Sequence, residues 1–203
     1  MEIKGRIKQK ADELFRQYGI KSVTMDEIAS QLAVSKKTIY QSFADKNELV
    51  DAVISDMILY NQNCCSKYAS AAENAIHEAF LAMEMIQEMF SDFHPSILFD
   101  MQRNHPNTFS KFLKHKYSFL LQVIKNNIER GIKEGLYRPD INTDVVAKIR
   151  LETIFIPFNQ ELFPNSKFNF VDLEKQLIEY FLFGIASPKG YKLVIKYRQQ
   201  KKL

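Results

Sequence analysis

The sequence of 203 residues has no tryptophan, only two cysteines, and only six glycines and six prolines. Neither glycine nor proline occurs between Gly19 and Pro95. A segment of this length without residues that break helices favours helices over strands and hairpins. With 46% hydrophobic residues, 16 of them phenylalanine, the chain can also bury a bulky core. We therefore expect an all-α fold.

Other absences exclude several classes of protein. Cys64 and Cys65 are adjacent, which matches neither a zinc motif nor a secreted disulfide framework. The N-terminal residues lack the apolar run of a signal peptide, and no segment approaches the length of a membrane span. We therefore expect a cytoplasmic protein without membrane contacts. A Gly-rich phosphate loop, a nucleophile elbow and HExxH are all absent, which argues against an enzyme.

No metal or other cofactor is expected either. The four histidines are too scattered for a metal-ligand pattern: His77, His94, His105 and His115. The net charge of +4 is weak evidence for a nucleic-acid partner, because six cations without an acid lie from Lys189 onward and leave the rest slightly acidic. This tail is either a second nucleic-acid contact or, as we prefer, a solvated helix with Leu193, Val194 and Tyr197 packed inward.

The N-terminal residues predict three short helices. The first has apolar residues at helical spacing: Ile3, Ile7, Ala11, Leu14, Phe15 and Tyr18. Gly19 is expected to end it in a left-handed conformation. Thr24 with Glu27 forms a capping box that begins the second helix, on which Ile28 and Leu32 face inward.

The third helix is expected to begin after Ser35 as its N-cap, with Val34 and Ile39 as a hydrophobic staple. A further capping box, Asp45 with Glu48, predicts a long fourth helix. One face of that helix carries the predicted inward residues: Leu49, Val53, Met57, Tyr60 and Cys64.

The outer face of the third helix carries the main functional signal. Lys36, Lys37, Thr38, Tyr40 and Gln41 point outward there. Cations in the first turn oppose the helix dipole, at a cost of a few tenths of a kcal/mol each, so their placement indicates an anionic partner. Cations, hydroxyls and a tyrosine suit a helix in the major groove of DNA. The alternative is a well-capped helical bundle with a solvated face.

These residues resemble the TetR family of bacterial transcriptional regulators. The resemblance rests on Ala11-x-x-Leu14-Phe15-x-x-x-Gly19, on Val23 to Ala29, and on Val34 to Tyr40 followed by Phe43, Lys46 and Leu49. Gly131 to Arg138 resembles a helix ending in the family's second domain. The resemblance implies a homodimer that binds a palindromic operator through residues 1–46 and a small effector through residues 47–203.

The candidate DNA-binding residues follow from this arrangement: Thr24, Ser35, Lys36, Lys37, Thr38, Tyr40, Gln41 and Lys46. We expect Lys36 and Lys37 to compete for guanine or phosphates, and Thr38 to touch a base edge. Tyr40 would bind a phosphate, as the matching tyrosine does in similar proteins. Lys46 and the N-terminus of the second helix would face the backbone. One departure is Ala33, where the family usually has glycine; it predicts a strained or reshaped turn.

Further helices are expected near 71–92, 95–104, 107–135, 143–162 and 169–186, with a kink at Pro157. Their Met and Phe stripes are either core or the lining of an apolar or aromatic effector site. The candidate effector residues are Phe80, Met83, Phe90, Phe99, Phe112, Phe119 and Phe155. Five charged residues would either recognise a charged group on the effector or form ordinary surface charges and ion pairs: Glu84, Glu88, Arg103, Arg150 and Glu152.

The last two of these helices are candidates for a two-fold dimer interface, with intramolecular packing as the alternative. Their apolar residues are Val145, Val146, Ile149, Ile154 and Ile156, and Leu173, Leu177, Phe181, Gly184 and Ile185. The sequence therefore predicts a dimeric repressor released by an effector that moves the fourth helix. The alternatives are an architectural DNA-binding protein without an effector and a helical interaction module that has lost DNA binding.

Overall fold

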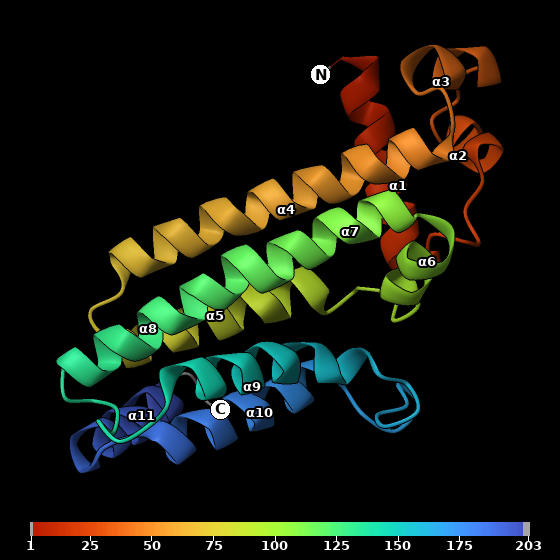
Figure 1. Ribbon diagram of the computed structural model, residues 1–203. Coiled ribbons are helices and arrows are strands. Elements are labelled where there is room, and N and C mark those ends of the chain that lie inside the picture. The colour runs from red at the N-terminus through yellow and green to blue at the C-terminus, as the bar shows by residue number, and fades with distance from the viewer. Residues whose placement is uncertain (1, 201–203) are drawn as a thin grey trace. The chain divides into compact units, whose positions relative to one another are not determined.

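The computed structural model describes residues 2–200, which form helices joined by turns and loops and contain no β-strand (Figure 1). An isolated antiparallel bridge joins Tyr137 and Ala186. None of the helices in this part of the chain is long and apolar enough to span a bilayer. The expected all-α fold is confirmed.

The chain divides into two compact units. The first unit comprises the residues up to Asn61 together with Asp92–His115, and the second comprises Gln62–Ser91 together with the residues from Lys116 onward. The predicted functional boundary after residue 46 is a separate matter and stays a prediction. Helix α4 (Lys46–Ala71) contributes to both units.

The first unit contains α1 (Ile3–Tyr18), α2 (Met25–Gln31), α3 (Lys36–Ser42), the beginning of α4, α6 (Ile97–Asn104) and α7 (Pro106–Lys114). Its core is formed by the apolar faces of these helices: Ile7, Ala11, Leu14, Phe15, Ile20, Val23, Ile28, Ile39, Phe43, Leu49 and Met101 are buried. Two predicted inward residues are exposed instead, Tyr18 and Tyr60. Tyr18 is the last residue of its predicted apolar stripe and Tyr60 the last but one, so helical spacing alone placed them wrongly.

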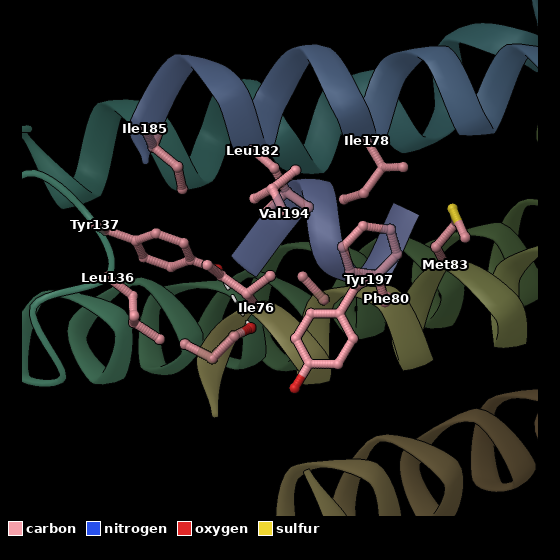
Figure 2. Close-up of a cluster of buried hydrophobic side chains, with 12 residues drawn as sticks. Ile76, Phe80, Met83, Leu136, Tyr137, Ile178, Leu182, Ile185, Val194 and Tyr197 are labelled. Carbon is pink, nitrogen blue, oxygen red and sulfur yellow. Dashed lines mark hydrogen bonds between the residues drawn. The ribbon is translucent and has the colours of Figure 1, made fainter. Parts of the chain in front are cut away.

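The second unit contains α5 (Ala75–Phe90), α8 (Leu121–Lys133), α9 (Thr143–Phe155), α10 (Phe170–Ile185) and α11 (Pro188–Gln200). A π-helical turn (His115–Leu120) joins α7 to α8, and a 3-10 turn (Ile156–Phe158) follows α9. Figure 2 shows the core in which α5, α10 and α11 meet the segment after α8. Its buried members include Ile76, Phe80, Leu182, Val194 and Tyr197. The inward packing expected of the C-terminal helix is thus confirmed.

The helix ending predicted at Gly131–Arg138 is present. Gly135 adopts φ 68°, and the amides of Leu136 and Tyr137 donate to the carbonyl of Gly131 at 2.8 and 3.0 Å. A Cβ on Gly131 would lie 2.1 Å from the ring of Tyr137, so only glycine allows this ring to pack there. The segment then pairs with the end of α10, where the amide of Arg138 donates to the carbonyl of Ile185.

Two helix predictions need correction. Helix α9 ends at Phe155 rather than continuing to residue 162, because Pro157 ends the α-helix instead of kinking it. Helix α5 begins at Ala75, not near 71, because the side chain of Asn74 caps it by accepting from the amide of His77. The segment 107–135 is helical as expected, apart from its π-helical turn and the last two residues.

Candidate nucleic-acid interface

Helices α2 and α3 begin at the predicted caps. The hydroxyl of Thr24 accepts from the amide of Glu27, and that of Ser35 accepts from the amide of Thr38, each at 3.1 Å. At the start of α4, Asp45 accepts from the amide of Glu48, whose carboxylate accepts from the amide of Ala44. These local bonds fix where each helix begins.

The turn between α2 and α3 keeps an ordinary helix-ending geometry despite Ala33. The amide of Val34 donates to the carbonyl of Ala29 at 3.0 Å, and that of Ala33 to the carbonyl of Ser30 at 3.1 Å. These two bonds define a Schellman motif, whose left-handed position usually holds glycine. Ala33 occupies it at φ 53°, the only positive φ outside glycine in residues 2–200. The turn is therefore strained by about 1 kcal/mol but not reshaped.

One face of helix α3 is buried in the first unit, and the opposite face is exposed to solvent. Ile39 and Phe43 are buried, and the ammonium of Lys4 lies 4.9 Å from the centre of the Phe43 ring. Lys36, Lys37, Tyr40 and Gln41 are exposed, whereas Thr38 is half-buried. The hydroxyls of Thr38 and Ser35 are hydrogen-bonded to each other at 2.8 Å. The side chains predicted to point outward therefore lie together on α3, and Thr38 is the one that is partly covered.

The two adjacent lysines differ in their surroundings. Lys36 forms an ion pair with Asp26 on α2, and this hydrogen bond raises the pKa of Lys36 above its ordinary value. Lys37 is exposed and has no ion-pair partner among the residues that the structure describes. Since Asp26 offsets part of the charge of Lys36, Lys37 is the more available cation.

Lys46 lies partly inside the first unit. Its ammonium donates to the carbonyl oxygens of Ile20, at 2.6 Å, and of Val23, which lie in the turn between α1 and α2. Burial lowers the pKa of Lys46 below its ordinary value. Sequence reasoning assigned this residue to DNA alone; the structure gives it a role in holding the turn that leads into Thr24. Its contact with a phosphate stays a prediction.

Helix α6 also contacts the turn between α1 and α2. The sequence analysis did not connect this helix with DNA binding. The buried carboxylate of Asp100 accepts from the amide of Lys21 at 3.0 Å and from the hydroxyl of Ser96 at 3.1 Å. Gly19 has φ 79° but an extended ψ of 158°, a region that essentially only glycine adopts, and not the expected left-handed helical one. A Cβ there would lie 2.5 Å from the hydroxyl oxygen of Ser96.

Helix α7 is joined to α4 by polar contacts within the first unit. Thr108 and Lys111 both donate to Asp51, at 3.1 and 2.6 Å. His115 and Asn61 are buried and hydrogen-bonded at 3.0 Å, and burial lowers the pKa of His115 to about 4. The sequence could have indicated these contacts, because Asp100 and Thr108 are polar residues at helical positions that face the core.

Comparison with known proteins identifies this arrangement. Residues 7–53, which span most of α1, all of α2 and α3, and the start of α4, match the family described as bacterial regulatory proteins, tetR family. The N-terminal helices are therefore similar to the DNA-binding region of that family. These helices match the DNA-binding helix-turn-helix of TetR-family proteins, and the chain is a transcriptional regulator.

Relatives and solved structures agree with this similarity. The chain is 28% identical over 157 residues to the HTH-type transcriptional regulator YhgD of Bacillus subtilis, covering 73% of this chain and 81% of the relative. It is 23% identical to the regulator UidR of Escherichia coli K12, covering 74% and 76%. A TetR-family regulator from Marinobacter aquaeolei shares the fold with a TM-score of 0.78 at 16% identity, covering 98% of both chains.

The candidate effector residues do not gather into one lining. Phe80 and Met83 are fully enclosed in the core of the second unit, whereas Phe90, Phe119 and Phe155 are half-buried. Phe99, on α6, is 59% exposed, and Phe112 is buried in the first unit. A cavity in the second unit is lined by none of these seven side chains. Their role in binding an effector stays a prediction.

The five charged residues considered for effector recognition lie in different surroundings. Glu152 pairs with Lys116 at 2.8 Å, and Arg150 is buried beside Glu174. Glu88 and Arg103 are exposed, and Glu84 is half-buried. Among residues 2–200 no group of His, Cys, Asp or Glu side chains is placed to hold a metal ion.

Proposed function

We propose that this chain is a homodimeric repressor of the TetR family that binds a palindromic operator and is released by a small, apolar or aromatic effector. The observation that carries the DNA part is the exposed N-terminal turn of α3, with Lys37 unpaired among the described residues and no acid in that turn. The N-terminal end of a recognition helix is the end that enters the major groove.

In this proposal Lys37 reads guanine O6 and N7, and Lys36 shares that position or contacts a flanking phosphate. Thr38 contacts a base edge with its methyl group, because its hydroxyl is bonded to Ser35. Tyr40 and Gln41 bind the phosphate backbone from the exposed face of α3. The amides at Thr24 and Ser35 place helix N-termini against phosphates, and Lys46 adds a cation behind them.

A dimer is supported by apolar side chains that the second unit leaves exposed on its last long helices. Val145 and Ile149 on α9 are exposed, and Tyr180 on α10 is 86% exposed. Gly184 lies on the same helix, and a Cβ there would meet no atom within 4 Å. Several exposed apolar residues with an open glycine suit close packing against a second copy. A two-fold interface would join two DNA-binding units at a fixed spacing.

Release would follow from a change in that spacing. Helix α4 is continuous from Lys46 to Ala71 and contributes to both units, so a displacement in the second unit is passed along it. Two recognition helices must lie roughly 34–36 Å apart to enter successive major grooves. An effector that binds better to another spacing would therefore weaken operator binding.

A second candidate, an architectural DNA-binding protein without an effector, is favoured by the dense packing of Phe80 and Met83. Selection of bound duplexes from a random pool tests the repressor proposal first. It predicts an inverted repeat; recovery of no sequence motif would favour the architectural protein. Thermal-shift screening then separates the two, because only a ligand-binding protein gains stability by mass action.

A further inference from the structure

The second unit contains a cavity of about 70 Å³ that lies within this unit alone. Helices α5, α8, α9 and α10 supply its wall. Most of the wall is apolar: Ala79, Ala82, Ile86, Val123, Ile124, Ile154, Ile178 and Phe181. Three polar side chains complete it, Glu78, Asn127 and Arg150. The polar groups decide which ligand the cavity can recognise.

Two of these polar side chains are already engaged by the fold. A carboxylate oxygen of Glu78 accepts from the guanidinium of Arg130 at 3.0 Å. Asn127 donates to the carbonyl of Ala75 at 2.9 Å and accepts from the hydroxyl of Tyr137 at 3.2 Å. Neither side chain needs a ligand to satisfy it.

Arg150 differs from Glu78 and Asn127, because the fold gives its guanidinium N–H donors only long polar contacts. Its side chain is almost entirely buried, and its guanidinium carries five N–H groups. One nitrogen lies 3.5 Å from the hydroxyl of Thr153 and another 3.7 Å from a carboxylate oxygen of Glu174. The guanidinium carbon also lies over the Phe181 ring, 5.6 Å from its centre. The wall therefore offers hydrogen-bond donors rather than acceptors.

Glu174 is the only acid paired with Arg150 in the part of the chain that the structure describes, and the pair is poorly formed. Glu174 is fully buried, yet neither carboxylate oxygen accepts a hydrogen bond from residues 2–200. A buried ion pair offsets its desolvation cost only with good geometry and further hydrogen bonds. This pair has neither, so it contributes little as a purely structural element. A carboxylate placed closer to the guanidinium would displace Glu174 as its partner.

We propose that the cavity binds a small carboxylate with a short apolar body, its carboxylate on the guanidinium of Arg150. This inference rests on the proposed function, since it names the chemical class of effector that the second unit takes. Arginine binds carboxylates through two parallel hydrogen bonds. The apolar body lies against Ile154, Ile178 and Ala82.

The size of the cavity limits the ligand. At ~10–15 Å³ for each water-sized position, the cavity holds roughly five to seven positions. Butanoate, with six non-hydrogen atoms, matches that size. Butanamide has the same number of non-hydrogen atoms without the charge, so it is the matched neutral control, and butylamine is the cationic one.

Titrations of the full chain, followed through the methyl NMR signals of Ile154 and Ile178, test this proposal. Butanoate is expected to shift both signals saturably, and butanamide and butylamine are not. Glu174→Gln removes the competing carboxylate, so butanoate should bind roughly tenfold more tightly, as expected for one hydrogen bond between charged groups. Arg150→Gln in the Glu174→Gln background should abolish binding; because the pair is then neutral, no buried charge is left unpaired.

Equal binding of butanoate and butanamide would overturn the proposal, as would unchanged affinity in Glu174→Gln or retained binding in the double variant. The amide spectrum of each variant reports whether it is folded. Operator binding is measured separately. If another molecule releases the operator while no carboxylate binds, the repressor function stands and the carboxylate site fails. If butanoate binds without affecting the operator, the site stands and the effector role fails.

Discussion

The ammonium of Lys46, the first residue of α4, donates to the carbonyl oxygen of Ile20 at 2.6 Å. This bond joins the helix that both units share to the turn that precedes the helix-turn-helix. The amide of Lys21, the next residue in that turn, donates to Asp100 on α6. The position of the DNA-binding helices is therefore fixed by α4 and α6 together.

Replacing Lys46 with alanine should affect both folding and DNA binding. The carbonyls of Ile20 and Val23 lose their donor, which should lower the free energy of unfolding by about 1 kcal/mol. Loss of a backbone cation should weaken operator and scrambled duplexes alike and reduce the salt slope by about 1. Chemical denaturation and anisotropy titrations at several salt concentrations measure these effects. A loss confined to the operator would contradict this role.

Lys37→Ala should cost ~1–3 kcal/mol on the operator and relax the preference at one base position. Its stability should not change, because the side chain is exposed. Lys36→Ala is the matched control and should cost less, since Asp26 already pairs with Lys36. Titrations on the operator and a scrambled duplex measure both variants. Equal losses on the two duplexes for Lys37→Ala would show that Lys37 does not read the sequence.

Ala33→Gly should raise the free energy of unfolding by about 1 kcal/mol, because glycine adopts the φ of 53° without strain. Ala33→Val should lower it, since a β-branched side chain tolerates this conformation least. Denaturant titration of the three proteins measures the order. If glycine were no more stable than alanine, the turn would not be strained.

The stability of the protein should fall as the pH rises through the range in which Glu174 titrates. Burial raises the pKa of Glu174 from an ordinary value of 4.5 to about 7, although Arg150 acts in the opposite direction. Between these values the folded protein binds more protons than the unfolded chain, so its free energy of unfolding decreases with pH. Glu174→Gln should remove this part of the slope in denaturation curves recorded from pH 4.5 to 8. An unchanged slope would show that Glu174 is not the group responsible.

Features that depend on nearby residues could be predicted from the sequence. The caps at Thr24, Ser35 and Asp45 involve bonds that reach three residues along the chain, and all three are present. The positive φ at Ala33 was expected because the TetR family usually has glycine at this position. Such bonds form wherever the local sequence permits them.

Features that depend on the folded arrangement could not be predicted. The roles of Lys46 and Asp100 depend on residues 26 and 79 positions away along the chain. Phe99 fitted a predicted apolar stripe yet is exposed, because periodicity does not show which residues another helix covers. The cavity beside Arg150 likewise arises from four helices that are separate in the sequence.

A spacer series tests the central claim most directly: anisotropy titrations at low ionic strength on inverted repeats built from the selected half-site. Two rigidly paired copies of α3 should bind best with half-site centres one helical turn apart, about 10 base pairs, and an insertion of half a turn should remove most of the affinity. Gly184→Arg, placed on the exposed face of α10, should abolish this dependence on spacing. Equal affinity for every spacer would contradict a dimer that places two recognition helices in successive grooves.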